Sequence, residues 1–286
     1  MIRLGVNTWL WANRFEYRHL ACIDRAVEME AEAIDFSVND PYTFPVKEVK
    51  DKLKGKELEV IVTTAMPSHC NPISPESWER EAALDYMKKL ILTADSLGAK
   101  VVGGVNYAGS GYHSGKPRTQ AEVELAAGYL DKAAAFARGY GITVAMEPVK
   151  RIETHFLNTA AQALELIDLV GADNLKVHLD TFHMNIEEAD LPGAIRACGA
   201  RLAHLHLVEN NRDTPGRGHI PWKEIFEAVR DVNFEGAGCI ETFNPQTLEE
   251  TAPLTYLTRR FADTPEELAK SGLEFLKKVR TEVYGM

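Results

Sequence analysis

The sequence predicts a (β/α)8 TIM barrel with a C-terminal helical extension, and two observations carry this prediction. Strand and helix signals alternate along the chain in eight successive units, with no Pro-, Ser- or Gly-rich linker long enough to separate domains. The length of 286 residues also suits one large α/β domain. We therefore expect a single domain over residues 1–286, with the barrel over about 1–245 and the extension over about 246–286.

Eight short runs rich in aliphatic or β-branched residues predict buried parallel strands. These strands are expected over residues 2–7, 31–38, 57–66, 99–107, 142–146, 175–179, 201–208 and 236–243. Longer segments between them predict helices over residues 19–30, 46–54, 75–97, 119–140, 160–170, 187–198 and 222–232. One strand, one helix and their loops then recur about every 30 residues, as in a chain of βαβ units.

Residues at the segment ends support these helices. Thr159, after Asn158, is an N-cap signal for the helix over 160–170, and Gly171 stands where that helix should end. Thr264 followed by Pro265 predicts the start of a last helix that packs on the barrel. An open doubly wound sheet is the alternative fold, but no G-x-G-x-x-G motif follows the first strand.

Composition narrows the class of partner. The formal net charge is -10, from 42 acidic and 32 basic residues, which argues against nucleic acid or a membrane as partner and favours a small neutral substrate. The four cysteines form no C-x-x-C pair and are too few for a disulfide framework, so we expect a cytoplasmic protein. The sequence shows no signal-peptide pattern, and no apolar stretch reaches the roughly 18 residues of a membrane span.

Four metal-competent side chains fall near the ends of the last four strands. They are Glu147, Asp180, His206 and Glu241, separated by 33, 26 and 35 residues. In a barrel, the carboxyl ends of the strands share one face, where the chemistry is usually found. Three carboxylates and one imidazole suit Mn²⁺, Mg²⁺ or Co²⁺ better than an ion that prefers thiolates. Taken singly, Glu147 or Asp180 could instead cap a helix or pair with a lysine.

Three more polar residues are expected in the loops that follow these strands. Glu153 lies six residues after Glu147, His183 three after Asp180, and Arg212 six after His206. Loops beyond barrel strands build the substrate pocket, which makes these residues candidates for substrate binding. The alternatives are an exposed histidine at a helix start for His183, and a rim ion pair with Asp213 or Glu209 for Arg212.

Other residues near the strand ends have weaker indications. His178 and His204 are expected in the barrel wall. Trp9 and Trp11 predict either an apolar wall over a sugar or burial under the C-terminal helix. Three loop residues, predicted at most to line the pocket, are His69, Cys70 and His113.

The chemistry of such a site follows from its residue types. Inverting a carbon next to a carbonyl requires removal of its proton, stabilisation of an enediolate and return of a proton to the other face. A divalent ion stabilises the oxyanion, and two carboxylates can act as base and acid. Glu147 and Glu241 come from the fifth and eighth strands and can bracket a substrate. Two opposed carboxylates favour epimerisation, although isomerases and dehydratases use similar ligands.

Four motifs near the candidate site are specific, namely MEPVKRIETHFLNT, HLDTFHMNIEE, HLHLVENNR and CIETF. They resemble the divalent-metal ketose 3-epimerases, the D-tagatose and D-psicose (allulose) 3-epimerase group of the xylose-isomerase-like TIM barrels, and the resemblance is closest over residues 142–243. It implies Glu147, Asp180, His206 and Glu241 as metal ligands, whereas the catalytic role of Glu147 and Glu241 follows from the chemistry of two opposed carboxylates. It further implies substrate contacts by three residues, Glu153, His183 and Arg212. The chain departs from the family pattern in the loop over 213–219.

The resemblance also implies what the protein acts on. The expected reaction is inversion of C3 of a free ketose of the D-tagatose, D-psicose, D-fructose or L-ribulose class through a metal-stabilised cis-enediolate. Mn²⁺ is the expected cofactor, with Co²⁺ or Mg²⁺ as alternatives and no organic cofactor, and the expected assembly is a homodimer or homotetramer.

Other functions stay open at this point. They are a hydroxypyruvate isomerase-like or inosose dehydratase-like enzyme, an enzyme acting on a 3-keto sugar, a phosphodiesterase resembling endonuclease IV and a non-catalytic sugar-binding protein. The phosphodiesterase would need a histidine-rich three-metal cluster and a basic face, to which a net charge of -10 is poorly suited.

Overall fold

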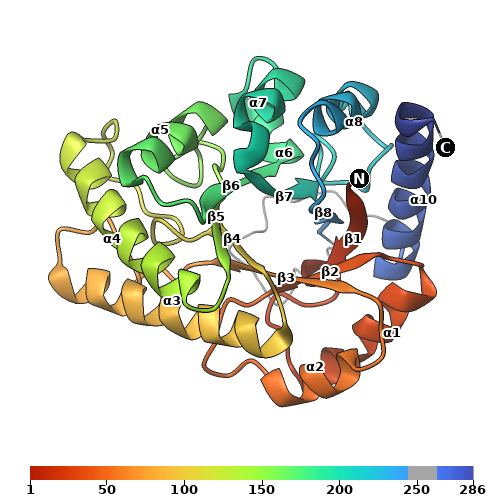
Figure 1. The fold of residues 1–286 in the computed structure, drawn as a ribbon, viewed down its shortest axis with the longest axis horizontal. Coiled ribbons are helices and arrows are strands. Elements are labelled where there is room, and N and C mark those ends of the chain that lie inside the picture. Colours follow the sequence, from red (N-terminus) through yellow and green to blue (C-terminus); the bar gives the residue numbers. More distant parts are fainter. Residues whose placement is uncertain (244–262, 286) are drawn as a thin grey trace.

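A computed structural model of the chain describes residues 1–243 and 263–285. Eight parallel strands form a closed barrel in chain order, and the first strand pairs with the eighth. The predicted (β/α)8 architecture is therefore confirmed. Figure 1 shows the strands at the centre of the molecule and the helices around them.

Each strand is short, and its neighbours in sequence are its neighbours in the barrel. The strands are β1 (Arg3–Asn7), β2 (Ala33–Ser37), β3 (Glu59–Ala65), β4 (Val101–Val105), β5 (Thr143–Met146), β6 (Leu175–Asp180), β7 (Leu202–Leu207) and β8 (Ala237–Ile240). Seven of these strands lie within their predicted ranges. The remaining one, β6, extends one residue beyond its predicted range, to Asp180.

The α-helices follow the strands as expected from the alternating pattern. They are α1 (Ala21–Glu28), α2 (Val46–Leu53), α3 (Ser77–Leu97), α4 (Gln120–Arg138), α5 (Ala160–Val170), α6 (Thr181–Glu187), α7 (Leu191–Cys198), α8 (Trp222–Asp231) and α10 (Pro265–Tyr284). Three short 3-10 helices are η1 (Thr8–Leu10), η2 (Tyr17–His19) and η3 (Gly199–Arg201). The Thr159 hydroxyl caps α5, and Gly171 ends it with a positive φ of 69°, as predicted.

The segment between β6 and β7 differs from its prediction. One helix was expected over 187–198, whereas the structure has α6 directly after β6 and then α7. The Asp180 carboxylate accepts a hydrogen bond from the Phe182 N–H at 2.6 Å and so starts α6 at the strand end. Asp190 caps α7 in the same way, through the Gly193 N–H. Consequently His183, expected in a loop, lies on a helix.

The C-terminal helix α10 begins as the sequence predicts. Thr264 and Glu267 form a reciprocal capping box at its start. The helix packs against α8 and β1 and lies between α8 and α1 in the outer ring (Figure 1). The Arg280 guanidinium near its end binds the Glu32 carboxylate and the Ile2 carbonyl oxygen. Residues 246–262 of the expected extension lie outside the described residues.

The interior of the barrel changes character along its axis. Near the amino ends of the strands it is closed by a small apolar cluster, formed by Ala33, Ile61, Ala237 and Cys239. Farther along the strands, polar side chains take over, among them Asp35, His178, His204 and His206, all essentially buried. The main apolar core lies outside the barrel, between the strands and the helices. The polar interior therefore leads directly to the carboxyl ends of the strands.

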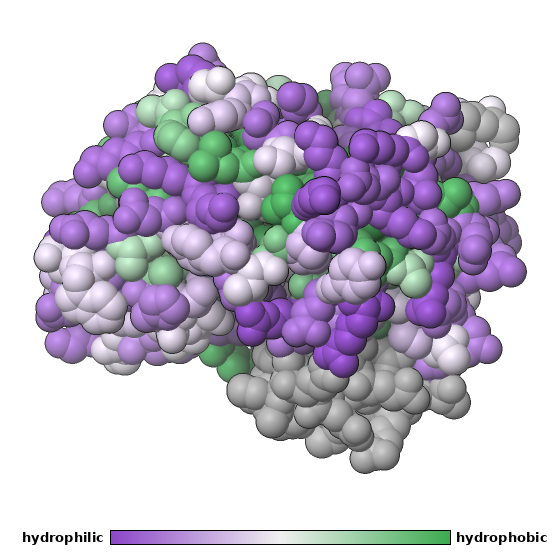
Figure 2. Space-filling model, turned by 90° about the horizontal axis from the view of Figure 1, so that it is seen from below, coloured by the Kyte–Doolittle hydropathy of each residue, from purple (hydrophilic) through white to green (hydrophobic). Residues whose placement is uncertain are grey.

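The outer surface seen in Figure 2 is mostly hydrophilic, with hydrophobic residues scattered among the polar ones. Within 1–243 and 263–285, every helix is too short or too polar to cross a bilayer.

Candidate active site

The structure brings the four predicted strand-end residues together. Glu147 follows β5, Asp180 ends β6, His206 lies near the end of β7, and Glu241 follows β8. The Nδ1 atom of His206 lies 3.6 Å from Glu147 Oε1 and 3.2 Å from Glu241 Oε1. Glu147, Asp180 and His206 each offer a ligand atom within 4.8 Å of the others. The two glutamates thus approach one imidazole from strands that lie three places apart in the ring.

Burial and charge set the protonation of the three carboxylates. Burial raises the pKa of Glu147, and it raises that of Glu241 to about 8 although His206 and Arg212 oppose this shift. Asp180 is different. Burial again acts to raise its pKa, but Arg212 and His183 outweigh it, so the pKa of Asp180 lies below its usual value. The site therefore combines one ionised carboxylate with two that bind protons readily.

His206 is the only nitrogen-bearing side chain of the four, and its Nδ1 atom has no hydrogen-bond partner among the described residues. Its Nδ1 atom is buried and lies close to Glu241 without hydrogen-bond geometry. Burial lowers the pKa of His206, but Glu241, Asp35 and Glu147 together raise it well above the usual value. A buried nitrogen that can act as a metal ligand, together with three carboxylates, has the composition of a site for a hard divalent cation.

Arg212 is buried in the site and does not lie at the rim. Its Nη1 atom lies 3.1 Å from Asp180 Oδ2 and 2.9 Å from Glu241 Oε2. The guanidinium is held between the rings of Phe182 and Phe243, at 4.1 and 4.4 Å from their centroids. Its backbone has a φ of 62°, which is uncommon for a residue with a side chain. This strained backbone supports a functional role.

Glu153 and His183 stand beside Arg212 in the site. Glu153 forms an ion pair with the buried ammonium of Lys150. The Nδ1 atom of His183 accepts a hydrogen bond from the Lys150 N–H at 3.2 Å, and its Nε2 atom lies 3.1 Å from Arg212 Nη2. Burial lowers the pKa of His183 to about 4, so this imidazole is neutral at physiological pH. The three predicted substrate contacts are thus adjacent to one another.

A cavity of about 570 Å³ opens over these groups. This volume is in the range of small-molecule sites. Trp9 stacks on Phe243 at a centroid distance of 4.9 Å and forms part of the wall. The candidate residues that line the cavity are Glu147, Glu153, His183, His206, Arg212 and Glu241.

The sequence left two alternatives for the tryptophans near the N-terminus, an apolar wall or a place under the C-terminal helix, and one tryptophan takes each. Trp9 lies in the cavity wall, whereas Trp11 donates a hydrogen bond from Nε1 to Glu266 of α10 at 2.8 Å. The three residues expected at most to line the pocket do not do so: His69 and Cys70 line a neighbouring hollow, and the exposed His113 donates to the Ile152 carbonyl oxygen.

The loop over 213–219, where the sequence departs from the family pattern, packs mainly on the outer ring. The Thr214 hydroxyl donates to the Leu268 carbonyl oxygen of α10 at 2.7 Å. The Gly216 N–H donates to Glu209 Oε1 at 2.8 Å. The described residues that line the cavity include none from this loop.

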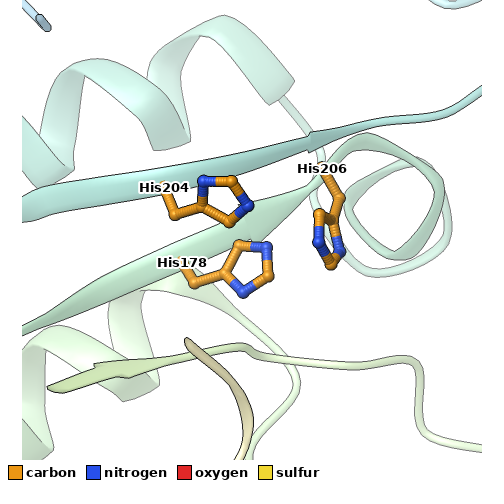
Figure 3. Close-up of side chains that lie close together, drawn as sticks. All are labelled: His178, His204 and His206. Atoms are coloured by element: carbon orange, nitrogen blue, oxygen red, sulfur yellow. The ribbon is translucent and has the colours of Figure 1, made fainter. Parts of the chain in front are cut away.

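Asp35 is a buried polar residue of the site region that the sequence reasoning missed. It lies on β2 below His206 and is fully buried. A charged residue in the middle of an otherwise apolar strand was the available signal. His204 and His178 are buried in the barrel, in agreement with their predicted place in its wall; His204 Nε2 lies 3.2 Å from Asp35 Oδ2, and the centroid of the His178 ring lies 4.6 Å from that of His204 (Figure 3).

Together, the closed barrel, the cavity at the carboxyl ends of its strands and the buried acid and imidazole groups define a barrel enzyme whose site contains residues that could hold a metal ion. The chain belongs to the xylose isomerase-like TIM barrel family, which matches residues 23–279.

Among the relatives of this chain are proteins named as ketose 3-epimerases. The chain is 30% identical over 251 residues to an L-ribulose 3-epimerase of Mesorhizobium japonicum, with 87% of this chain and 84% of the relative covered. It is 29% identical to a D-psicose 3-epimerase of Enterocloster bolteae, with 97% and 96% covered. A solved L-ribulose 3-epimerase structure matches with a TM-score of 0.91 and 28% identity, covering 100% of this chain and 96% of the other. The resemblance to ketose 3-epimerases and the isomerase class are thereby confirmed.

Proposed function

We propose that the protein is a divalent-metal-dependent epimerase that inverts C3 of a free ketose. The observation that carries this proposal is the pair of buried carboxylates, Glu147 and Glu241, that share one imidazole at the floor of one cavity. The relatives named L-ribulose 3-epimerase and D-psicose 3-epimerase support the same reaction.

The residues that would hold the cation are Glu147, Asp180, His206 and Glu241. Their oxygen-rich composition fits the group, and the unpartnered Nδ1 of His206 supplies the nitrogen ligand. Mn²⁺ is the cation we propose, with Co²⁺ and Mg²⁺ as the alternatives, and we propose no organic cofactor. When bound, such a cation supplies Lewis-acid stabilisation of the negative charge that develops on the sugar oxygens.

Glu147 and Glu241 perform the proton transfers in this proposal. One carboxylate removes the C3 proton from one face of the ketose, and the other returns a proton to the opposite face. In the metal-free protein, burial raises the pKa of both groups toward the range in which a general acid or base is most effective, and a bound cation acts in the opposite direction. Reversal of their roles carries out the reverse epimerisation, which a reversible reaction requires.

Three charged or polar groups next to the carboxylates orient the sugar. Arg212 and the neutral His183 offer hydrogen bonds to the carbonyl end, and Glu153 accepts from a hydroxyl group. The stacked pair Trp9 and Phe243 gives an apolar wall for the carbon-bound hydrogens of the ring or chain. A low-dielectric wall of this kind also excludes water from the enediolate.

The proposed substrates are D-tagatose, D-psicose, D-fructose and L-ribulose, and the proposed assembly is a homodimer or homotetramer. The test is to incubate Mn²⁺-loaded enzyme with each ketose and to separate the products by chromatography. We expect the C3 epimer of at least one sugar, and loss of that product after metal removal. An aldose or a dehydrated product in place of the C3 epimer contradicts the proposal.

A further inference from the structure

Asp35 is a fully buried carboxylate that lies directly below His206. It accepts hydrogen bonds at 2.8 Å from Asn7 Nδ2 and at 2.8 Å from the Thr63 hydroxyl. His204 Nε2 and His206 Nε2 approach it at 3.2 and 2.8 Å. The Asn7 amide oxygen is already occupied by the Trp9 N–H and the Ser37 hydroxyl, which assigns the Asn7 nitrogen as the donor. Asp35 is therefore an acceptor enclosed by donors.

Two groups face the Nε2 atom of His206, the donor Asn7 Nδ2 at 3.3 Å and the acceptor Asp35 Oδ2 at 2.8 Å, and the shorter contact, to the acceptor, favours a proton on this nitrogen. An acceptor-only carboxylate requires a hydrogen on the Nε2 atom that faces it. In the neutral form of the ring, the Nδ1 atom then carries the lone pair, on the side of Glu147 and Glu241, whose oxygens lie at 3.6 and 3.2 Å. A histidine can bind a cation only through an unprotonated nitrogen, and the partner of its other nitrogen fixes which one that is.

The neighbouring imidazoles hold this ring in place. Figure 3 shows His204 and His206 projecting from β7 and His178 from β6 into the same space. The His178 ring packs edge-on against His206 at a centroid distance of 4.1 Å, and His204 lies at 5.1 Å. His178 Nδ1 accepts from the Gly104 N–H at 3.2 Å, which fixes that ring in turn.

We propose that Asp35 is a positioning residue that sets the tautomer and orientation of His206 for cation binding. It acts through His206 and has no contact with the substrate. The inference rests on the cation site of the proposed function. The three imidazoles could alternatively form a second cation site, but Asp35 already engages the Nε2 atoms of both His204 and His206.

The test uses Asp35→Asn, which keeps the size of the side chain but replaces one acceptor oxygen by an NH₂ donor. An amide with one acceptor cannot satisfy four donors, so the proton of His206 is expected to move from Nε2 to Nδ1. Mn²⁺ titration should then show a dissociation constant about 10 to 100 times that of the natural protein, the range found for such outer partners. The control Ile61→Val alters the apolar cluster of the same barrel at the residue paired with Asp35 in the sheet, removes no hydrogen-bonding group, and should leave the constant within about twofold.

A spectroscopic measurement reads the tautomer itself. In ¹⁵N-histidine-labelled natural protein loaded with diamagnetic Mg²⁺, His206 should carry its proton on Nε2. A proton on Nδ1 in that sample overturns the inference and needs no variant to fold. Unchanged Mn²⁺ affinity in folded Asp35→Asn also overturns it. Two Mn²⁺ equivalents per chain, one of them lost in His204→Gln, overturn it in favour of a second cation site. If the natural protein binds no divalent cation, the proposed function itself fails.

Discussion

At the level of single residues, the site places two carboxylates of raised pKa around one imidazole. Glu147 and Glu241 both approach the Nδ1 atom of His206, and burial is the main cause of both pKa shifts. Arg212 lies against Asp180 and Glu241 and partly offsets the negative charge. Each of these groups therefore has a distinct expected effect when it is replaced.

Replacing either glutamate by glutamine should remove one of the two proton-transfer groups. General acid-base groups contribute about 10² to 10⁴ in rate, or roughly 2.7 to 5.4 kcal/mol. We expect Glu147→Gln and Glu241→Gln to lose at least this much epimerisation. Each should retain slow C3 hydrogen exchange with solvent for one epimer only, and the preferred epimer should differ between the two variants. Mass spectrometry in heavy water measures this, and metal content must be matched. Identical epimer preferences would favour a single carboxylate.

Arg212 should contribute to substrate binding and not to cation binding. Arg212→Met keeps apolar contact with Phe182 and Phe243 but removes the positive charge beside Asp180 and Glu241. We expect kcat/KM to fall by about 10-fold or more, because oriented binding is lost. Mn²⁺ affinity should stay the same or increase, since a competing cation has been removed. Weaker Mn²⁺ binding in calorimetry would show that Arg212 organises the carboxylates.

The raised pKa of Glu241 predicts a pH dependence of stability. Its pKa is about 8 in the folded metal-free protein, against an ordinary value of 4.5, so folding favours the protonated form. This contribution is present below about pH 4.5 and is lost as the pH rises to about 8. Glu241→Gln should remove it. Urea unfolding of both proteins between pH 5 and 9 measures the difference.

The metal should act in the opposite sense, because its ligands must be deprotonated. We therefore expect the stabilisation by Mn²⁺ to increase over the same pH range. If the free energies of unfolding of the metal-free natural protein and of metal-free Glu241→Gln differ by an amount that does not vary with pH, the raised pKa of Glu241 is contradicted.

At the level of elements, Asp180 has two structural roles in addition to its place in the candidate cation site. It ends β6 and caps α6, the helix that carries His183. Such a short helix depends on its cap and on packing, because its own propensity is insufficient. The strand-to-helix junction therefore couples the cation site to a substrate contact.

Two substitutions of Asp180 separate these roles. Asparagine caps helices as well as aspartate does, whereas alanine loses a cap worth about 0.5 to 2 kcal/mol. We expect Asp180→Asn, which keeps the cap but loses the ion pair with Arg212, to lower the melting temperature of the metal-free protein less than Asp180→Ala does, and to lose most of the rise caused by Mn²⁺. Asp180→Ala should lower the melting temperature in both conditions. A full Mn²⁺ effect in Asp180→Asn would exclude this carboxylate as a ligand.

The junction also shows where sequence reasoning succeeds and where it stops. Apolar runs, Thr159 and Gly171 were sufficient to predict β5, α5 and β6 closely, since these signals are local. The short helix α6 was missed because Asp180 combines a strand end, a candidate ligand and an N-cap in one residue. Its cap becomes apparent only when the backbone geometry is known.

At the level of the whole molecule, closure of the barrel determines the site. The periodic spacing of Glu147, Asp180, His206 and Glu241 predicted their common edge, because parallel strands in a barrel end on one face. The contribution of Asp35 could not be predicted in this way. Asp35 lies on β2 and contacts His206 of β7 across the barrel interior. The two residues are 171 positions apart in the sequence, so no local sequence pattern predicts their contact. The burial of Arg212 likewise depends on Phe243, far along the chain.

Hydrogen exchange at C3 of a ketose in heavy water decides whether the protein is a metal-dependent C3 epimerase. Enzyme stripped of metal, as verified by elemental analysis, and the same sample reloaded with Mn²⁺ are incubated with D-psicose, D-tagatose, D-fructose and L-ribulose. We predict deuterium at C3 of at least one sugar and of its epimer, only after reloading. Full activity without metal, or exchange at another carbon alone in every sugar, would contradict a metal-dependent C3 epimerase.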